Sequence, residues 1–132
     1  MPRRGMTLTE LLMTVIVIAI LASMALPQYR RTVERGYWRT SQDVLRTIYA
    51  GQQVYFTIND QYVDNPTTLA QWRQIYMDDP NGSIPIPVTF SVTTNGLSGA
   101  AATFTATATR DAGIFMTIDE INILDTTAWP QP

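Results

Sequence analysis

The fold of this chain is decided by residues 5–29, which read GMTLTELLMTVIVIAILASMALPQY. From Leu11 to Tyr29 there are 19 residues without a charge. As a helix they would span about 28 Å, close to the hydrocarbon thickness of a bilayer, about 30 Å. The sequence therefore predicts an apolar helix over residues 6–27 that is long enough to cross a membrane.

The residues before this helix predict its orientation. Arg3 and Arg4 precede the apolar run, and basic residues beside a membrane span favour the cytoplasmic side. We therefore expect a single-pass precursor with a cytoplasmic N-terminus. A secretory signal peptide is the alternative, with a loose cleavage site at residues 22–25. The apolar run is longer than the usual signal core of about 7 to 15 residues, and it contains a carboxylate near its start.

That carboxylate, Glu10, has two interpretations. An acidic group inside a bilayer is unfavourable by about 2.5 to 3.5 kcal/mol at the helix centre, and by less near the interface. One interpretation is local, because Thr7 and Glu10 have the spacing of a capping box, which satisfies free N–H groups at a helix start. The other is that Glu10 pairs with a cation on another subunit once the helix leaves the lipid.

Composition excludes several classes of function. The chain has 132 residues, which is room for one domain and one appendage. Its net charge of -2 argues against binding nucleic acid. It contains no Cys, His or Lys, so disulfides, thiolate metal sites and the commonest nucleophiles and general bases are missing. We expect no enzyme activity, no cofactor and no metal site.

A second helical pattern follows Pro27. Apolar side chains recur at spacings of four and seven residues, which predicts an amphipathic helix over residues 28–57 that packs on a sheet of its own chain. Its stripe comprises Val33, Tyr37, Val44, Ile48 and Tyr55, with Trp38, Leu45, Tyr49 and Phe56 beside them.

The remaining residues, 58–132, predict a globular head. A cap at residues 66–68 precedes a short helix to about Tyr76 with Trp72 on its buried side, and residues 78–82 form a turn cluster. Alternating residues then predict three or four antiparallel strands: residues 88–92, residues 104–108, and residues 114–118 with Ile121 and Ile123 continuing the pattern. Trp129 is a candidate anchor for the tail. The fold class is therefore α+β, with a long N-terminal helix on a small antiparallel sheet.

The N-terminal residues resemble a known signature. Residues 5–12, the short basic leader before them and the apolar run ending at Pro27 resemble the prepilin cleavage and methylation signature of type IV pilins and pseudopilins. The resemblance implies a leader of residues 1–5 that is cut after Gly5, Met6 as the N-methylated amino terminus, Glu10 as the fifth mature residue, and Pro27 as a point where the helix bends or loosens. Many pilins also share the fold expected from the second half.

Two positions depart from that family. Family members usually have Phe where this chain has Met6, and an aliphatic residue where it has Thr9. Neither change removes the glycine before the cleavage point or the carboxylate, so processing is still expected.

The resemblance also implies a function and partners. It implies a structural subunit of a type IV pilus, used for adhesion, motility or DNA uptake; the alternative is a pseudopilin of a type II secretion system, in a periplasmic filament. The implied partners are copies of the chain itself, a prepilin peptidase that also methylates, and an inner-membrane platform with an ATPase motor. The precursor would lie in the bacterial inner membrane and the assembled protein in an extracellular pilus.

Overall fold

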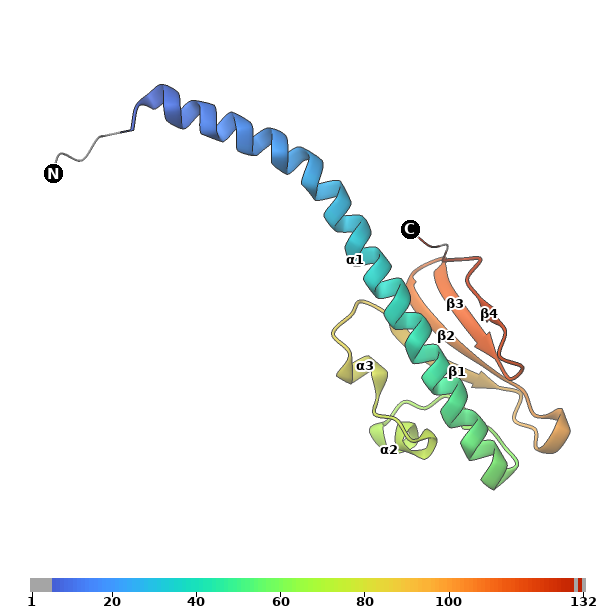
Figure 1. Ribbon diagram of the computed structural model, residues 1–132. Coiled ribbons are helices and arrows are strands. Elements are labelled where there is room, and N and C mark those ends of the chain that lie inside the picture. Colours follow the sequence, from blue (N-terminus) through green and yellow to red (C-terminus); the bar gives the residue numbers. More distant parts are fainter. Residues whose placement is uncertain (1–5, 130, 132) are drawn as a thin grey trace. The chain divides into compact units, whose positions relative to one another are not determined.

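The computed structural model describes residues 6–129 and 131, and it divides the chain into two units, Met1–Glu34 and Arg35–Pro132. One helix, α1 (Leu8–Asn59), contributes to both (Figure 1). The long N-terminal helix expected from the sequence is therefore confirmed. Pro27 lies inside it and does not interrupt it.

The second unit contains a four-stranded antiparallel sheet in the order β1-β2-β3-β4 (Figure 1). The strands are β1 (Thr89–Thr94), β2 (Phe104–Asp111), β3 (Ile114–Asp119) and β4 (Leu124–Asp125). Each strand pairs with its neighbour in sequence, so the sheet is a simple meander. Gly113, with φ 84°, supplies the left-handed backbone that the tight β2–β3 turn needs.

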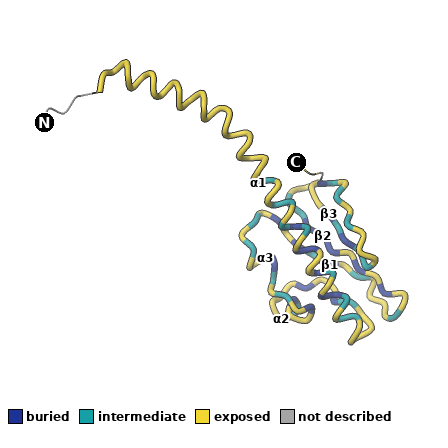
Figure 2. The backbone as a smooth tube through the Cα atoms, viewed as in Figure 1, coloured by how far each residue is buried: buried dark blue, intermediate teal, exposed yellow. Residues whose placement is uncertain are grey.

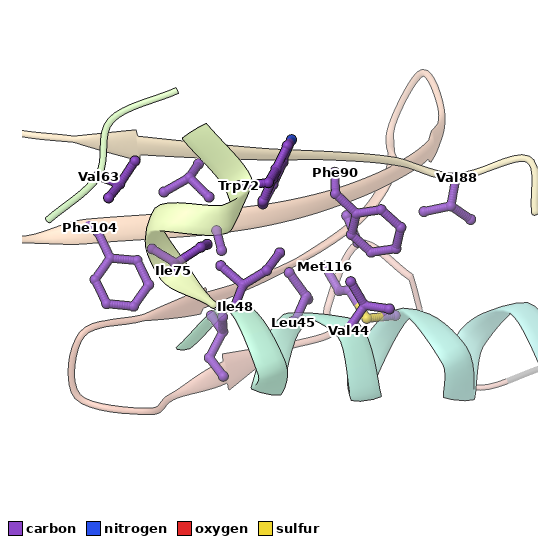
Figure 3. Packing of buried hydrophobic residues seen from close by; sticks show 14 of the residues in the cluster. Val44, Leu45, Ile48, Val63, Trp72, Ile75, Val88, Phe90, Phe104 and Met116 are labelled. Atoms are coloured by element: carbon purple, nitrogen blue, oxygen red, sulfur yellow. The ribbon is translucent and has the colours of Figure 1, made fainter. Parts of the chain in front are cut away.

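The core lies between α1 and one face of this sheet (Figure 3). The helix contributes Val44, Leu45 and Ile48, which are among the stripe predicted from the sequence. The strands contribute alternate residues, as expected for a sheet with one buried face. The α+β fold is confirmed. The buried strand residues are Phe90, Val92, Phe104, Ala106, Ala108, Met116 and Ile118.

Short helices close one end of the core. Thr68 and Gln71 form a capping box at the start of α2 (Leu69–Trp72), which continues as η1 (Arg73–Ile75). Trp72 and Ile75 are fully buried, so the predicted short helix with Trp72 inward is confirmed. Tyr76 then ends it in the left-handed conformation, with φ 60°.

The predicted turn at residues 78–82 is in fact a one-turn helix, α3 (Pro80–Ser83). Asp79 caps it by accepting a hydrogen bond from the Asn81 N–H at 3.0 Å, and Pro80 occupies a first-turn position where its missing N–H has no consequence. The Asn81 side chain then bonds both backbone groups of Phe90, at 2.7 and 3.0 Å. The edge strand β1 is thereby covered where it would otherwise expose backbone groups.

Ile121 and Ile123 do not extend the sheet. They are 67% and 57% exposed in the loop between β3 and β4. The Asp119 carboxylate accepts hydrogen bonds from both of their N–H groups, at 3.2 and 2.7 Å, and Asn122 takes a positive φ of 65°. This side-chain turn ends β3 before the apolar alternation ends.

Side-chain hydrogen bonds fix the head to α1. The Gln52 side chain is fully buried and bonds the N–H and the carbonyl of Val63, at 2.9 and 2.8 Å. The Trp38 indole N–H donates to the Trp129 carbonyl at 2.9 Å. Trp129 is 4% exposed, so its predicted role as the tail anchor is confirmed.

Candidate assembly segment

The first part of α1 is an apolar surface with no cover from its own unit. Every described residue from Met6 to Thr32 is exposed (Figure 2). Among the described residues, α1 is the one helix long and apolar enough to cross a membrane. A surface of this kind needs lipid or other apolar helices around it. The large apolar residues with at least 50% exposure are Met6, Leu8, Leu11, Leu12, Met13, Val15, Ile16, Val17, Ile18, Ile20, Leu21, Met24, Leu26 and Tyr29.

Two hydroxyl groups of this segment donate hydrogen bonds within the helix. Thr14 donates to the Leu11 carbonyl at 2.7 Å, and Ser23 donates to the Ile20 carbonyl at 2.7 Å. Side chains bonded to their own backbone add little to the unfavourable free energy of entering an apolar medium. The carboxylate of Glu10 is then the one acidic group on the exposed apolar surface between Met6 and Tyr29.

Glu10 forms the predicted capping box with Thr7. Its N–H donates to Thr7 Oγ1 at 3.3 Å, and the Thr7 N–H donates to Glu10 Oε2 at 3.5 Å. Both distances are long for hydrogen bonds of this type. The box marks the start of α1, but it leaves the negative charge of Glu10 without a cation among the described residues.

The surface beside Glu10 is apolar. Met13, Thr14, Val17 and Ile18 border the same shallow hollow as Glu10, about 430 Å³ in volume. These residues follow Glu10 by three, four, seven and eight positions, so they share its helix face. A partner helix on this face would remove the carboxylate from water together with the apolar side chains. The spacing of these residues is a signal in the sequence that predicts this shared face.

The other predicted site residues do not form a cluster with Glu10. Gly5 lies outside the described residues. Met6 precedes α1 and is 60% exposed. Pro27 lies 17 positions after Glu10, inside the helix, where it has no N–H to donate to the Ser23 carbonyl. An α-amino group exists at Met6 only if the peptide bond before it is cut.

The described residues hold no group of three or more acidic, His or Cys side chains arranged for a metal ion. The segment from Met6 to Tyr29 is an exposed apolar surface with a single negative charge, that of Glu10.

Comparison with known proteins gives two matches. Residues 1–26 match the model of the prokaryotic N-terminal methylation motif. A stretch of 61 residues is 34% identical to the type IV major pilin protein PilA of Myxococcus xanthus (strain DK1622) and covers 46% of this chain. The aligned part is 28% of that protein, so the chain matches less than a third of its relative's length. No solved structure matches the chain significantly.

Proposed function

We propose that this chain is a structural subunit of a type IV pilus filament, because its first 26 residues match the prokaryotic N-terminal methylation motif and 61 residues are similar to a type IV major pilin. The family is one of structural subunits and not of enzymes. The proposal covers cleavage after Gly5, methylation of Met6, and assembly through the N-terminal part of α1. Adhesion, motility and DNA uptake are the activities of such a filament.

Processing follows from the charges of the leader. Arg3 and Arg4 would hold the precursor in the inner membrane with its N-terminus in the cytoplasm. The same two charges would be stranded in an apolar bundle of helices, because buried charges need partners. Cleavage after Gly5 by a prepilin peptidase removes them and creates an ammonium group at Met6.

The observation that carries the proposal is the exposed apolar helix with Glu10 at its edge. Transfer of such a helix from lipid to a bundle changes apolar burial little, since lipid tails are as apolar as Leu. Apolar contact alone therefore does not select a register, that is, how far one helix is shifted along its neighbour. Pairing of Glu10 with the Met6 ammonium of a neighbouring copy would select one, because any other register leaves two buried charges unpaired.

Assembly also requires work from outside the chain. Extraction of this segment from the bilayer exposes apolar surface equivalent to on the order of tens of kcal/mol. An inner-membrane platform with an ATPase motor would supply that work. The filament partner is the chain itself, in many copies.

The test is intact mass spectrometry of filaments sheared from cells. We expect a species of residues 6–132 carrying one added methyl group. Recovery of the processed chain only from membranes or periplasm would favour the pseudopilin of a type II secretion system instead. An uncleaved chain throughout would contradict the proposal.

Removal of the charge of Glu10 tests whether this carboxylate selects the register of the packed helices. Glu10→Gln keeps the shape of the side chain and removes its charge, so we expect filament yield to fall at least about tenfold, the change that 1.4 kcal/mol produces. Asp43→Asn is the matched control, because Asp43 is an exposed carboxylate of the same helix outside the apolar segment. A Glu10→Gln chain that assembles as well as this control would exclude the charge pairing.

A further inference from the structure

The outer surface of the head carries a line of charges along α1. Three residues of α1 recur at intervals of seven: Arg39, Arg46 and Gln53. Asp60 comes directly after the helix, which ends at Asn59, and takes a left-handed φ of 58°. Residues seven apart on a helix lie on nearly the same face, about 10.5 Å from one another. The Gln53 side chain donates to the Glu120 carbonyl at 3.1 Å, which brings Glu120 to this line. We call Arg39, Arg46, Glu120 and Asp60 the charged stripe.

The charged stripe has two positive groups followed by two negative groups. None of the four side chains forms an ion pair or a side-chain hydrogen bond among the described residues, whereas Arg73 pairs with Asp78 at 3.5 Å and Arg110 with Asp111 at 3.8 Å. Arg39, Arg46 and Asp60 are exposed and Glu120 is half-buried. Their charges are thus available to another molecule.

Opposite charges of the stripe lie too far apart to satisfy one another. The Arg46 and Gln53 positions are about 10.5 Å apart along the axis, beyond the screening length of about 8 Å at physiological salt. Asp43 lies one helical turn from both arginines but forms no ion pair with either in the part of the chain that the structure describes. It reduces the local positive charge without neutralising it.

We propose that the charged stripe docks on the same stripe of a second copy displaced along α1 by 14 residues, about 21 Å. One displacement brings Arg39 to the level of the neighbour's Glu120 and Arg46 to the level of the neighbour's Asp60. The positive half of one stripe faces the negative half of the next, so the contact joins two different surfaces. Such a head-to-tail contact repeats without closing, as in a helical filament. This inference rests on the proposed function and adds a contact between heads.

The surface beside the stripe has the character of an interface. A groove of about 280 Å³ lies on a neighbouring side of α1 and is bordered by Thr47, Ala50, Gly51, Val54, Ile75 and Tyr76. Ala50 follows Arg46 by four residues and precedes Gln53 by three, so it lies within about one helical turn of both. Val54 is 47% exposed and Tyr76 is 68% exposed. An apolar and aromatic centre with charges at its rim is typical of protein interfaces, which favours a protein partner over a lipid surface.

Charge reversal of single positions tests the proposal in the full-length chain. We expect Arg39→Glu to lower the yield of sheared filaments at least about tenfold, because like charges then face one another. Addition of Glu120→Arg to the same chain should restore the yield to within about threefold of the wild type. Arg73→Glu is the matched control, since Arg73 is an exposed arginine of the head with a partner in its own chain. We expect it to assemble normally.

With a displacement of 14 residues, each charge reversal should be restored only by reversal of its own partner. Glu120→Arg should restore Arg39→Glu but not Arg46→Glu, whose expected partner is Asp60. Equal rescue of both, rescue of neither, or wild-type yield of Arg39→Glu would overturn the proposed docking. Loss of the Arg39→Glu chain from anionic membranes with no rescue would assign the arginines to lipid headgroups and also overturn it. Absence of filaments from the wild type would overturn the proposed function as well.

Discussion

The two parts of α1 contain similar amino acids in different surroundings. Up to Thr32 every described residue is exposed, and the large apolar side chains lie on all sides of the helix. From Arg35 onward one face of the helix is buried, and Val44, Leu45 and Ile48 on it are at most 8% exposed. The first part thus lacks the burial that stabilises the second.

This difference shows which interactions a single chain completes. The second unit, Arg35–Pro132, buries an apolar core, bonds its buried Gln52 and holds its tail through Trp38. In the N-terminal part the Thr14 and Ser23 hydroxyls bond carbonyls of their own helix, but neither the apolar surface nor the charge of Glu10 has a partner among the described residues. Burial of that surface and pairing of that charge depend on lipid or on other copies of the chain.

The same substitution in the two parts should have opposite outcomes. Leu45→Ala removes a fully buried side chain and should lower the free energy of unfolding by about 2 to 5 kcal/mol. Leu21→Ala, where the side chain is 63% exposed, should leave the unfolding of the head unchanged. Fluorescence of Trp38, Trp72 and Trp129 measures this in detergent, because all three tryptophans lie in the second unit, Arg35–Pro132, which contains the head. Equal shifts for both variants would mean that the two parts unfold as one.

Glycine substitutions in α1 give a second contrast of intermediate size. A Cβ at Gly51 would overlap the carbonyl oxygen of Ile75 in η1, whereas a Cβ at Gly36 would meet open space. We expect Gly51→Ala to lower the stability of the head by about 1 to 3 kcal/mol through overpacking. Gly36→Ala should raise it by up to about 1 kcal/mol through helix propensity. Thermal unfolding of both variants measures the difference, and a stabilising Gly51→Ala would contradict the close packing.

Much of this fold could be predicted from residue patterns. The long uncharged run, the stripe around Val44 and Ile48, and the alternation of the strands each reflect burial that repeats with a helical or a strand period. Gln52 and Gly51 do not belong to the apolar stripe, so the helical pattern does not predict their burial. Their partners, Val63 and Ile75, come from segments that fold back on α1, and no local period encodes that contact.

Less could be predicted from the sequence for the assembly segment, the exposed N-terminal part of α1. The capping box of Thr7 and Glu10 follows from local spacing, and the structure contains it. The pairing of Glu10 with a cation involves a second copy, so a single chain leaves it a prediction. Ile121 and Ile123 show a local pattern that gave a wrong prediction. They continue the apolar alternation of a strand, but their N–H groups bond the Asp119 carboxylate and form a turn instead.

The smallest contrast concerns the two capping boxes, one in each part of the chain. In the head, Thr68 accepts from the Gln71 N–H at 3.4 Å, and Gln71 Oε1 accepts from the Thr68 N–H at 3.1 Å. Thr68→Ala should lower the free energy of unfolding by about 1 kcal/mol, which is a fall of about 4 to 8 °C in Tm for a domain of this size. Thr7→Ala removes the equivalent cap at the start of α1, where no head residue depends on it. We therefore expect the tryptophan-detected Tm to stay at the wild-type value, while helix content by far-ultraviolet circular dichroism falls slightly. A fall in that Tm for Thr7→Ala would show that the N-terminal part contributes to the stability of the head, and it would remove the distinction between the two parts.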